Sequence, residues 1–217
     1  MGHDKNARYN DLPNLPPADF VESQDIFRQP AKASRYLGEP NGLCASLPDP
    51  QLPTNTIVLQ ESRVSSAIEN IVTTQDELYK AATEEGTTSH AAKEVLSYRE
   101  ALYVGLEKMK AQKNLLFTNT MVEIVQTIKQ NKSGIRNAPG PSLKNAMNGE
   151  VIYTPPCCED VLSAKLAALE QFINDAEISP LDPLIKMALI RYQFEAIHPF
   201  SDGNGRTGRI VNALYLV

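Results

Sequence analysis

The chain has 217 residues, a formal net charge of −5 and an apolar content of 42%, values typical of a globular protein with one sizeable domain. The negative charge argues against the broad basic surface that non-specific nucleic-acid binding requires, so we expect no direct contact with nucleic acid. No run of eighteen or more apolar residues occurs, and the sequence therefore predicts no membrane span.

Histidines and cysteines are too few and too scattered for several kinds of site. Histidine occurs only at positions 3, 90 and 198, and cysteine only at positions 44, 157 and 158. This distribution provides neither a zinc-ligand cluster nor a disulfide framework. The first thirty residues also lack the apolar core of a signal peptide. Together these features predict a reduced, cytoplasmic protein.

The N-terminal quarter differs in composition from the rest of the chain. Residues 1–56 are rich in proline, asparagine, aspartate and serine, which predicts an irregular N-terminal arm. A helix is expected near 62–72, and further helices at about 91–109 and 118–130. The apolar face of the first helix is expected to comprise Val64, Ile68, Ile71 and Val72.

A flap or β-hairpin is expected near 134–154, because Asn148–Gly149 is a strong turn signal beside a strand-like segment. Helices are predicted over 158–175 and within 179–197, where Pro183 suits the first turn. The buried stripe of the latter helix is expected to contain Leu184, Ile185, Ala188, Leu189, Tyr192 and Ala196. A last helix begins near residue 207, so the predicted fold class is mainly α with one hairpin.

The loop 197–209 contains the residue types of a phosphate-handling site. It leads into a helix N-terminus, which attracts anions, and its glycines let a ligand approach the backbone. Arg206 and Arg209 share one helix face and suit phosphate oxygens. Asp202 is a hard oxygen ligand suited to Mg²⁺, and His198 suits a general base. The pattern indicates nucleotidyl or phosphoryl transfer.

Residues 203–208 also spell G-x-G-x-x-G, the fingerprint of a dinucleotide-binding turn. That fingerprint requires a preceding strand and an acidic residue about 20 positions later, whereas a helix is predicted here and the sequence given ends first. An NAD-binding oxidoreductase therefore remains an alternative, although the predicted elements around this segment do not fit it. A second alternative is a catalytically idle, ATP-binding interaction module.

The segment HPFSDGNGRTGR, residues 198–209, matches every fixed position of the Fic signature His-Pro-Phe-x-Asp/Glu-Gly-Asn-Gly-Arg-x-x-Arg. The chain therefore resembles the Fic family, and the segments GEVIYTPP and PLIKMALIRYQFEAIHPF are similar to the family's flap and to the helix entering its loop. The resemblance implies a Fic-type helical bundle over 57–217. Because similar Fic domains continue past the arginine helix, we expect the C-terminal part of the domain to be truncated here.

The resemblance implies a protein adenylyltransferase, which uses ATP and Mg²⁺ to attach AMP to a Ser, Thr or Tyr hydroxyl of a protein. His198 would deprotonate the hydroxyl as it attacks the α-phosphate and expels pyrophosphate, and Asp202 would hold Mg²⁺. Phe200 would be buried beneath the loop. The anion hole and the phosphate contacts would come from Gly203, Asn204, Gly205, Arg206 and Arg209.

The resemblance also implies a docking site for the target protein on the flap. A target segment would add as a strand, main chain to main chain, along Gly149, Glu150, Val151, Ile152 and Tyr153. Self-modification is a further expectation, with Tyr79, Tyr98 and Tyr103 as candidate acceptors.

One group of the Fic family carries an inhibitory helix marked Ser/Thr-x-x-x-Glu-Gly/Asn, and the chain contains one match, formed by Ser65, Glu69 and Asn70. By this resemblance Glu69 would pair with Arg209 and occupy the cation that the γ-phosphate needs. The same glutamate helps to remove AMP in some relatives. The alternative interpretation is that Glu69 lies on a solvated helix face without a function.

Overall fold

The computed structural model describes residues 4–18, 20, 23–45, 51–83, 89–177 and 180–217. In this part of the chain the regular structure is helical except for one two-stranded antiparallel sheet, as the sequence predicts. The elements, in chain order, are α1 (Gln24–Ala45), α2 (Gln51–Ile68), α3 (Gln75–Thr83), α4 (His90–Ala111), α5 (Thr118–Lys129), β1 (Leu143–Lys144), β2 (Val151–Tyr153), α6 (Glu159–Asn174), α7 (Pro183–Ile197) and α8 (Asn204–Tyr215).

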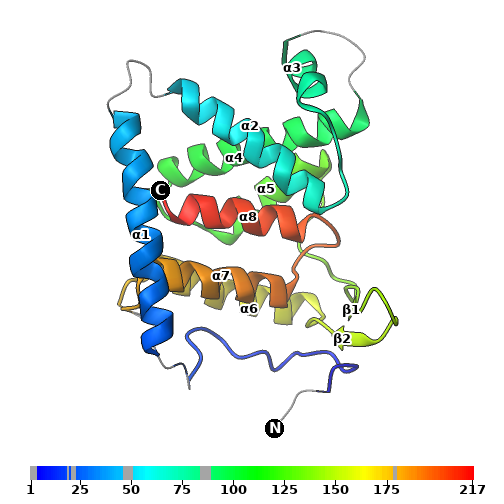
Figure 1. The fold of residues 1–217 in the computed structure, drawn as a ribbon. Coiled ribbons are helices and arrows are strands. Elements are labelled where there is room, and N and C mark those ends of the chain that lie inside the picture. Colours follow the sequence, from blue (N-terminus) through cyan, green and yellow to red (C-terminus); the bar gives the residue numbers. More distant parts are fainter. Residues whose placement is uncertain (1–3, 19, 21–22, 46–50, 84–88, 178–179) are drawn as a thin grey trace.

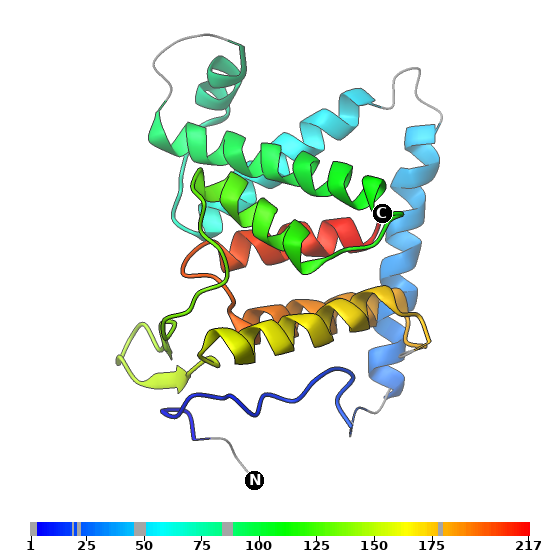
Figure 2. The same cartoon turned by 180° about the vertical axis from the view of Figure 1, so that it is seen from behind.

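α8 occupies the centre of the bundle, with α2, α4 and α5 on one side and α7 on the other (Figure 1). α6 covers the far side of α7, which is visible from behind (Figure 2). Ile210, Val211 and Leu214 of α8 are fully buried in the main core. Gly105 allows α4 to pack closely on α8, since a Cβ there would lie 2.7 Å from Leu214 Cδ1. This packing fixes the N-terminal turn of α8, where the loop 197–209 ends.

α7 begins as predicted, but its buried face matches the predicted one only in part. Asp182 caps its N-terminus by accepting from the Leu184 N–H at 2.9 Å, and Pro183 follows in the first turn. Of the expected stripe, Tyr192 is 68% exposed and Ala188 is exposed as well. Ile185 and Ala196 are buried as expected, but the stripe was wrong for Tyr192 and Ala188 because polar side chains share the buried face. That face is formed by Ile185, Lys186, Ile190, Gln193, Phe194, Ala196 and Ile197.

α2 also turns the opposite way from the sequence prediction. Val64, Ile68 and Val72 were expected to be buried, but they are 49%, 62% and 75% exposed. Ser62, Ser65 and Ser66 are buried instead. Small hydroxyl side chains let α2 approach α4 and α8 closely, and they can bond locally, as Ser62 Oγ does to the Val58 carbonyl at 2.7 Å.

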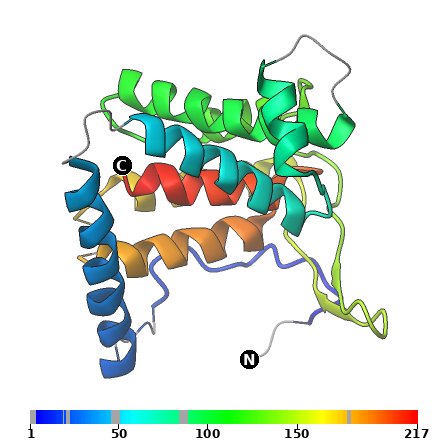
Figure 3. The same ribbon diagram turned by 45° about the horizontal axis from the view of Figure 1, so that its top comes forward.

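The N-terminal arm is more ordered than its composition predicts. Residues 24–45 form α1, which runs along one end of the bundle (Figure 3), so the expectation of an irregular arm is wrong there. Residues 4–18 are irregular but docked beneath α6 and α7 (Figure 1). Leu12 is buried in the core, and the Gln193 side chain donates to the Pro13 carbonyl at 2.8 Å.

The predicted hairpin is present at the edge of the bundle, beside the loop 197–209 (Figure 1). β1 pairs antiparallel with β2, with Leu143 opposite Tyr153 and Lys144 opposite Val151. Its connection includes Gly149 at φ 71°, a left-handed conformation that glycine adopts without strain.

None of the helices in the described part of the chain has the length and apolar character needed to cross a membrane.

Candidate functional site

The loop between α7 and α8 is clamped from inside by its own side chains. The Asn204 side chain accepts from the Phe200 N–H at 2.9 Å and donates to the Phe200 carbonyl at 2.7 Å. The Phe200 ring is buried, as expected, and lies 6.1 Å from the Phe194 ring. Asn204 therefore acts through its side chain as a loop clamp, and only its backbone remains available to an anion.

His198 ends α7 in a left-handed conformation with φ 50° and ψ 59°. Its N–H donates to the Phe194 carbonyl at 3.0 Å, which completes the last helical turn. Burial lowers the pKa of His198 below its ordinary 6.5, and the nearby Arg136 cation lowers it further. A hydrogen bond to the Glu195 backbone carbonyl has the opposite effect on this pKa. The imidazole is thus neutral at neutral pH, as a general base must be.

Asp202 lies at the exposed rim of the loop. Its Oδ1 accepts from the Gly203 N–H at 2.6 Å, and its Oδ2 pairs with Lys129 Nζ of α5 at 2.6 Å. The hydrogen bond from Lys129 is the main cause that lowers the pKa of Asp202. The carboxylate is therefore ionised and accessible, as a magnesium ligand would be. No cluster of three or more His, Cys, Asp or Glu residues suited to a metal occurs within the described ranges.

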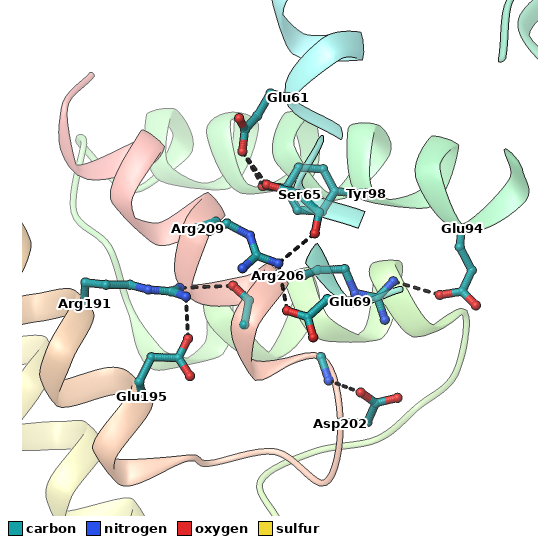
Figure 4. A network of polar contacts seen from close by, with 12 residues as sticks. Glu61, Ser65, Glu69, Glu94, Tyr98, Arg191, Glu195, Asp202, Arg206 and Arg209 are labelled. Carbon is teal, nitrogen blue, oxygen red and sulfur yellow. Dashed lines mark hydrogen bonds and ion pairs between the residues drawn. The ribbon is translucent and has the colours of Figure 1, made fainter. Parts of the chain in front are cut away.

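Arg206 and Arg209 point to different partners (Figure 4). Arg206 is 3% exposed and pairs through Nη1 with Glu94 Oε2 of α4 at 2.8 Å. Arg209 Nη2 donates to Glu69 Oε1 and to the Ser65 carbonyl, each at 2.8 Å. The buried Nε atoms of both arginines have no hydrogen-bond partner in the described structure. Such orphaned donors are unusual in folded proteins and are consistent with a site for an anionic ligand.

The Glu69 carboxylate follows α2 and reaches the first turn of α8. A Cβ placed on Gly205 would collide with Glu69 Oε1, so the carboxylate lies directly against this glycine. Helix N-termini bind anions through their free N–H groups and their dipole. Glu69 therefore occupies the position of an anion at the start of α8, beside Arg209.

A buried hydrogen-bond network holds α2 above this site (Figure 4). Glu61 Oε1 accepts from Ser65 Oγ at 2.5 Å and from the Tyr98 hydroxyl of α4 at 3.2 Å. Burial raises the pKa of Tyr98 to about 12, so the hydroxyl stays protonated and remains a donor. Tyr98 is fully buried, which contradicts its expected role as an acceptor of AMP.

Arg191 of α7 braces the loop from the opposite side. Its Nη1 donates to the Gly205 carbonyl at 3.0 Å, and its Nη2 pairs with Glu195 Oε1 at 2.6 Å. A Cβ on Gly208 would collide with Arg191 Nη1, so this glycine leaves room for the guanidinium. The hydrogen bond from Arg191 thereby fixes the carbonyl of Gly205 in the first turn of α8.

The expected flap residues lie on the hairpin, in β2 and in the turn that precedes it. Glu150 is exposed and forms an ion pair with Lys5 of the N-terminal segment. Ile152 is exposed, whereas Tyr153 is half-buried and donates from its hydroxyl to the Ala196 carbonyl at 2.9 Å. Tyr153 therefore joins the flap to the end of α7, next to His198.

Residues 27–107 match the Fic/DOC family N-terminal region, and residues 116–216 match the Fic/DOC family. Together the two matches span most of the chain. The chain belongs to the Fic/DOC family.

Relatives of this Fic chain include enzymes named as protein adenylyltransferases. Protein adenylyltransferase fic-1 of Caenorhabditis briggsae is 37% identical over 65 residues, which cover 30% of this chain and 13% of the relative. Protein adenylyltransferase Fic of Drosophila erecta is 41% identical over 59 residues, which cover 27% of this chain and 12% of the relative. The chain thus spans only a small part of the length of the curated relatives it matches.

Solved structures show the same fold at low sequence identity. A Fic family protein from Desulfovibrio desulfuricans G20 superposes with a TM-score of 0.70 and 21% identity, covering 91% of this chain and 58% of that one. A fragment of Fic-1 from C. elegans superposes with a TM-score of 0.65 and 16% identity, covering 88% and 57%. The mainly α bundle with its hairpin is therefore the fold of Fic proteins.

Several residues of the Fic site were not found from the sequence. They carry no local signature: Glu61, Glu94, Lys129, Arg136 and Arg191. Charged residues on amphipathic helices are usually solvated. Only the tertiary packing shows that Glu61 bonds to Ser65 and Tyr98 and that the other four side chains reach residues of the loop.

Proposed function

We propose that this Fic-family chain transfers AMP from ATP to a hydroxyl group of a protein, and that Glu69 holds it in an inhibited state. The observation that carries the proposal is the position of the Glu69 carboxylate on Arg209 and Gly205, at the start of α8. An anion already lies where the phosphates of a nucleotide would bind. The relatives named as protein adenylyltransferases support the reaction type.

The chemistry requires a base, an anion hole and charge neutralisation. His198 would take the proton of the target hydroxyl as its oxygen attacks the α-phosphorus of ATP, and pyrophosphate would leave with the bonding electrons. The lowered pKa of His198, caused first by burial, keeps its base form populated at neutral pH. Backbone N–H groups of Asn204 and Gly205 would face the phosphates, and that of Gly203 would join them on release from Asp202 Oδ1. Positioning and charge would supply most of the rate.

Magnesium fits the donor set of this site. Mg²⁺ is held in many nucleotide sites by one or two carboxylates together with substrate phosphates, and Asp202 provides one ionised, exposed carboxylate. When bound, Mg²⁺ would neutralise charge on the phosphates. Lys129, now paired with Asp202 Oδ2, would have to release that oxygen.

Inhibition follows from competition for Arg209. While Arg209 Nη2 donates to Glu69 and to the Ser65 carbonyl, this nitrogen is unavailable to a γ-phosphate. ATP could then bind only with its phosphate chain displaced from in-line geometry. Removing the carboxylate leaves the Ser65 carbonyl as the remaining acceptor and frees the anion position.

The flap would present the target to His198. β1 and β2 form a two-stranded sheet, to which an extended peptide would add main chain to main chain. The target would be a protein segment docked along residues 149–153, and the acceptor would be a Ser, Thr or Tyr hydroxyl. Self-modification would then fall on Tyr79 or Tyr103, since Tyr98 is buried.

The reaction type is tested with Glu69→Gly protein, Mg²⁺, a cell lysate and ATP labelled at either the α- or the γ-phosphate. Adenylyl transfer places the α-label on protein and leaves the γ-label in pyrophosphate. Transfer of the γ-label would instead indicate a kinase. ATP binding without transfer of either label would support the idle interaction module, and preference for NADH over ATP would support the oxidoreductase.

A further inference from the structure

Arg136 lies beneath the Fic loop without belonging to the signature. Its side chain is buried, and the guanidinium donates to four backbone carbonyls. Nε donates to His198 at 2.8 Å, and Nη1 to Ala138 at 3.0 Å. Nη2 donates to Pro156 at 2.6 Å and to Ile197 at 3.4 Å. A single side chain thus binds the segments before and after the hairpin and the end of α7.

The backbone around Arg136 packs closely against its guanidinium group. A Cβ on Gly140 would lie 2.7 Å from Arg136 Cζ, so the glycine packs flat against the guanidinium. The Arg136 N–H also donates to the Pro199 carbonyl at 2.9 Å, which adds a backbone bond to the same turn. A buried cation is costly unless it is fully hydrogen-bonded. The planar fork of arginine can satisfy four carbonyls, whereas lysine provides one point charge.

We propose that Arg136 is the positioning residue that holds the flap and His198 in one fixed frame. His198 has a left-handed backbone, which is strained for a residue other than glycine and persists only where surrounding contacts impose it. Arg136 supplies such a contact at the His198 carbonyl. A target strand docked on the hairpin therefore meets the base at a set distance. This inference rests on the proposed function.

Arg136 also acts on His198 through its charge. After burial, its cation is the largest cause that lowers the pKa of His198. The Glu195 carbonyl and the charges of Asp202 and Glu69 act in the opposite direction. Loss of the cation must therefore raise the pKa of His198, and this readout needs neither ATP nor a target protein.

The first test is a histidine NMR titration of the full 217-residue chain carrying Arg136→Met, with His198→Ala used to assign the signals. We expect the pKa of His198 to rise relative to the parent. If Arg136→Met does not fold, Gly140→Ala displaces the guanidinium while keeping the cation and should shift this pKa in the same direction. An unchanged titration of His198 in a folded variant would overturn the proposal.

The second test separates positioning from folding in the Glu69→Gly background. Arg136→Lys should lower kcat by about tenfold or more, because small misplacements of reacting groups are costly, while the Kd for ATP stays unchanged. Arg8→Lys is the matched control, since Arg8 Nη1 donates to the Gly140 carbonyl at 2.8 Å but does not reach the Fic loop. Equal losses in both variants, or parallel loss of ATP binding, would contradict a positioning role. A shifted His198 titration without AMP transfer in any variant would contradict only the proposed function.

Discussion

Arg209 Nη2 donates at once to the Glu69 carboxylate and to the Ser65 carbonyl, each at 2.8 Å, so one nitrogen is held by a side chain and by the backbone of α2. The proposed inhibition would therefore depend on the position of α2 as well as on one carboxylate. Ser65 is buried, whereas the Glu69 side chain is 40% exposed. Solvent access at Glu69 lets a polyphosphate compete for the arginine.

Glu69→Gly should strengthen ATP binding by about tenfold. Hydrogen bonds to charged groups contribute about 1.5–3 kcal/mol, and partial exposure of Glu69 favours the lower end, which corresponds to about tenfold. Calorimetry with a non-hydrolysable ATP analogue measures this change. Glu69→Asp is the control, because its shorter carboxylate keeps the charge while withdrawing it from Arg209. Equal affinities of the parent and Glu69→Gly would show that the pair does not compete with nucleotide.

Tyr98→Phe should weaken the inhibition by Glu69 without changing any residue of the loop 197–209. The Tyr98 hydroxyl donates to Glu61, which also accepts from Ser65, so its loss loosens α2 above Arg209. One hydrogen bond is worth about 1 kcal/mol, and AMP transfer by the parent should rise by about fivefold.

The control for this variant is Tyr103→Phe, whose hydroxyl donates to Asn55 of α2 at 2.9 Å, farther from the site. It should leave transfer to a separate target protein unchanged. In a Glu69→Gly background Tyr98→Phe should have no further effect. A loss of activity in both backgrounds would mean that Tyr98 supports only the fold.

The pH dependence follows from the lowered pKa of His198. The base form is deprotonated, so kcat/KM should rise with pH and reach its plateau with a midpoint below 6.5, the ordinary value. Glu69 raises this pKa by its charge, and its removal should move the midpoint lower still. A pH–rate profile of Glu69→Gly, from pH 5 upward, measures the midpoint. A midpoint at or above the ordinary value would contradict His198 as the buried base.

Glu94→Ala should destabilise the fold, because it leaves the buried Arg206 guanidinium without its carboxylate. Removing one partner of a buried ion pair costs about 3–5 kcal/mol, and partial exposure of Glu94 suggests about 3 kcal/mol. Chemical denaturation measures the free energy of unfolding. His90→Ala, at an exposed ring 3.4 Å from Glu94 Oε1, should cost less than about 0.5 kcal/mol. Equal stability of Glu94→Ala and the parent would rule out a structural role for the pair.

The site residues of the loop 197–209 could be proposed from the sequence because they lie close together in the chain. Glycines, a histidine, an aspartate and two arginines within this one loop are typical of a phosphate-handling site. The hairpin is likewise predicted by a local signal, the turn at Asn148–Gly149. Glu69 could be paired with Arg209 by resemblance, although the two lie far apart in the chain.

The faces of α2 and α7 could not be predicted. Helical periodicity assigns burial to the most apolar face. The buried face of α2 instead contains Ser65, which donates to Glu61 one turn earlier in the same helix, and that of α7 contains Gln193, which donates to the Pro13 carbonyl of the N-terminal segment. Arg136 was missed for a related reason, since its partners are carbonyls, which every sequence contains.

In the proposed reaction His198 is the base for AMP transfer, and Glu69 inhibits the transfer by pairing with Arg209. The most direct measurement compares the initial rate of α-label transfer by the parent, by Glu69→Gly and by Glu69→Gly/His198→Ala, at equal concentrations of folded protein. We predict slow transfer by the parent, faster transfer by Glu69→Gly and none without His198. Equal rates for the parent and Glu69→Gly would contradict the inhibition by Glu69, and transfer that survives His198→Ala would contradict the base.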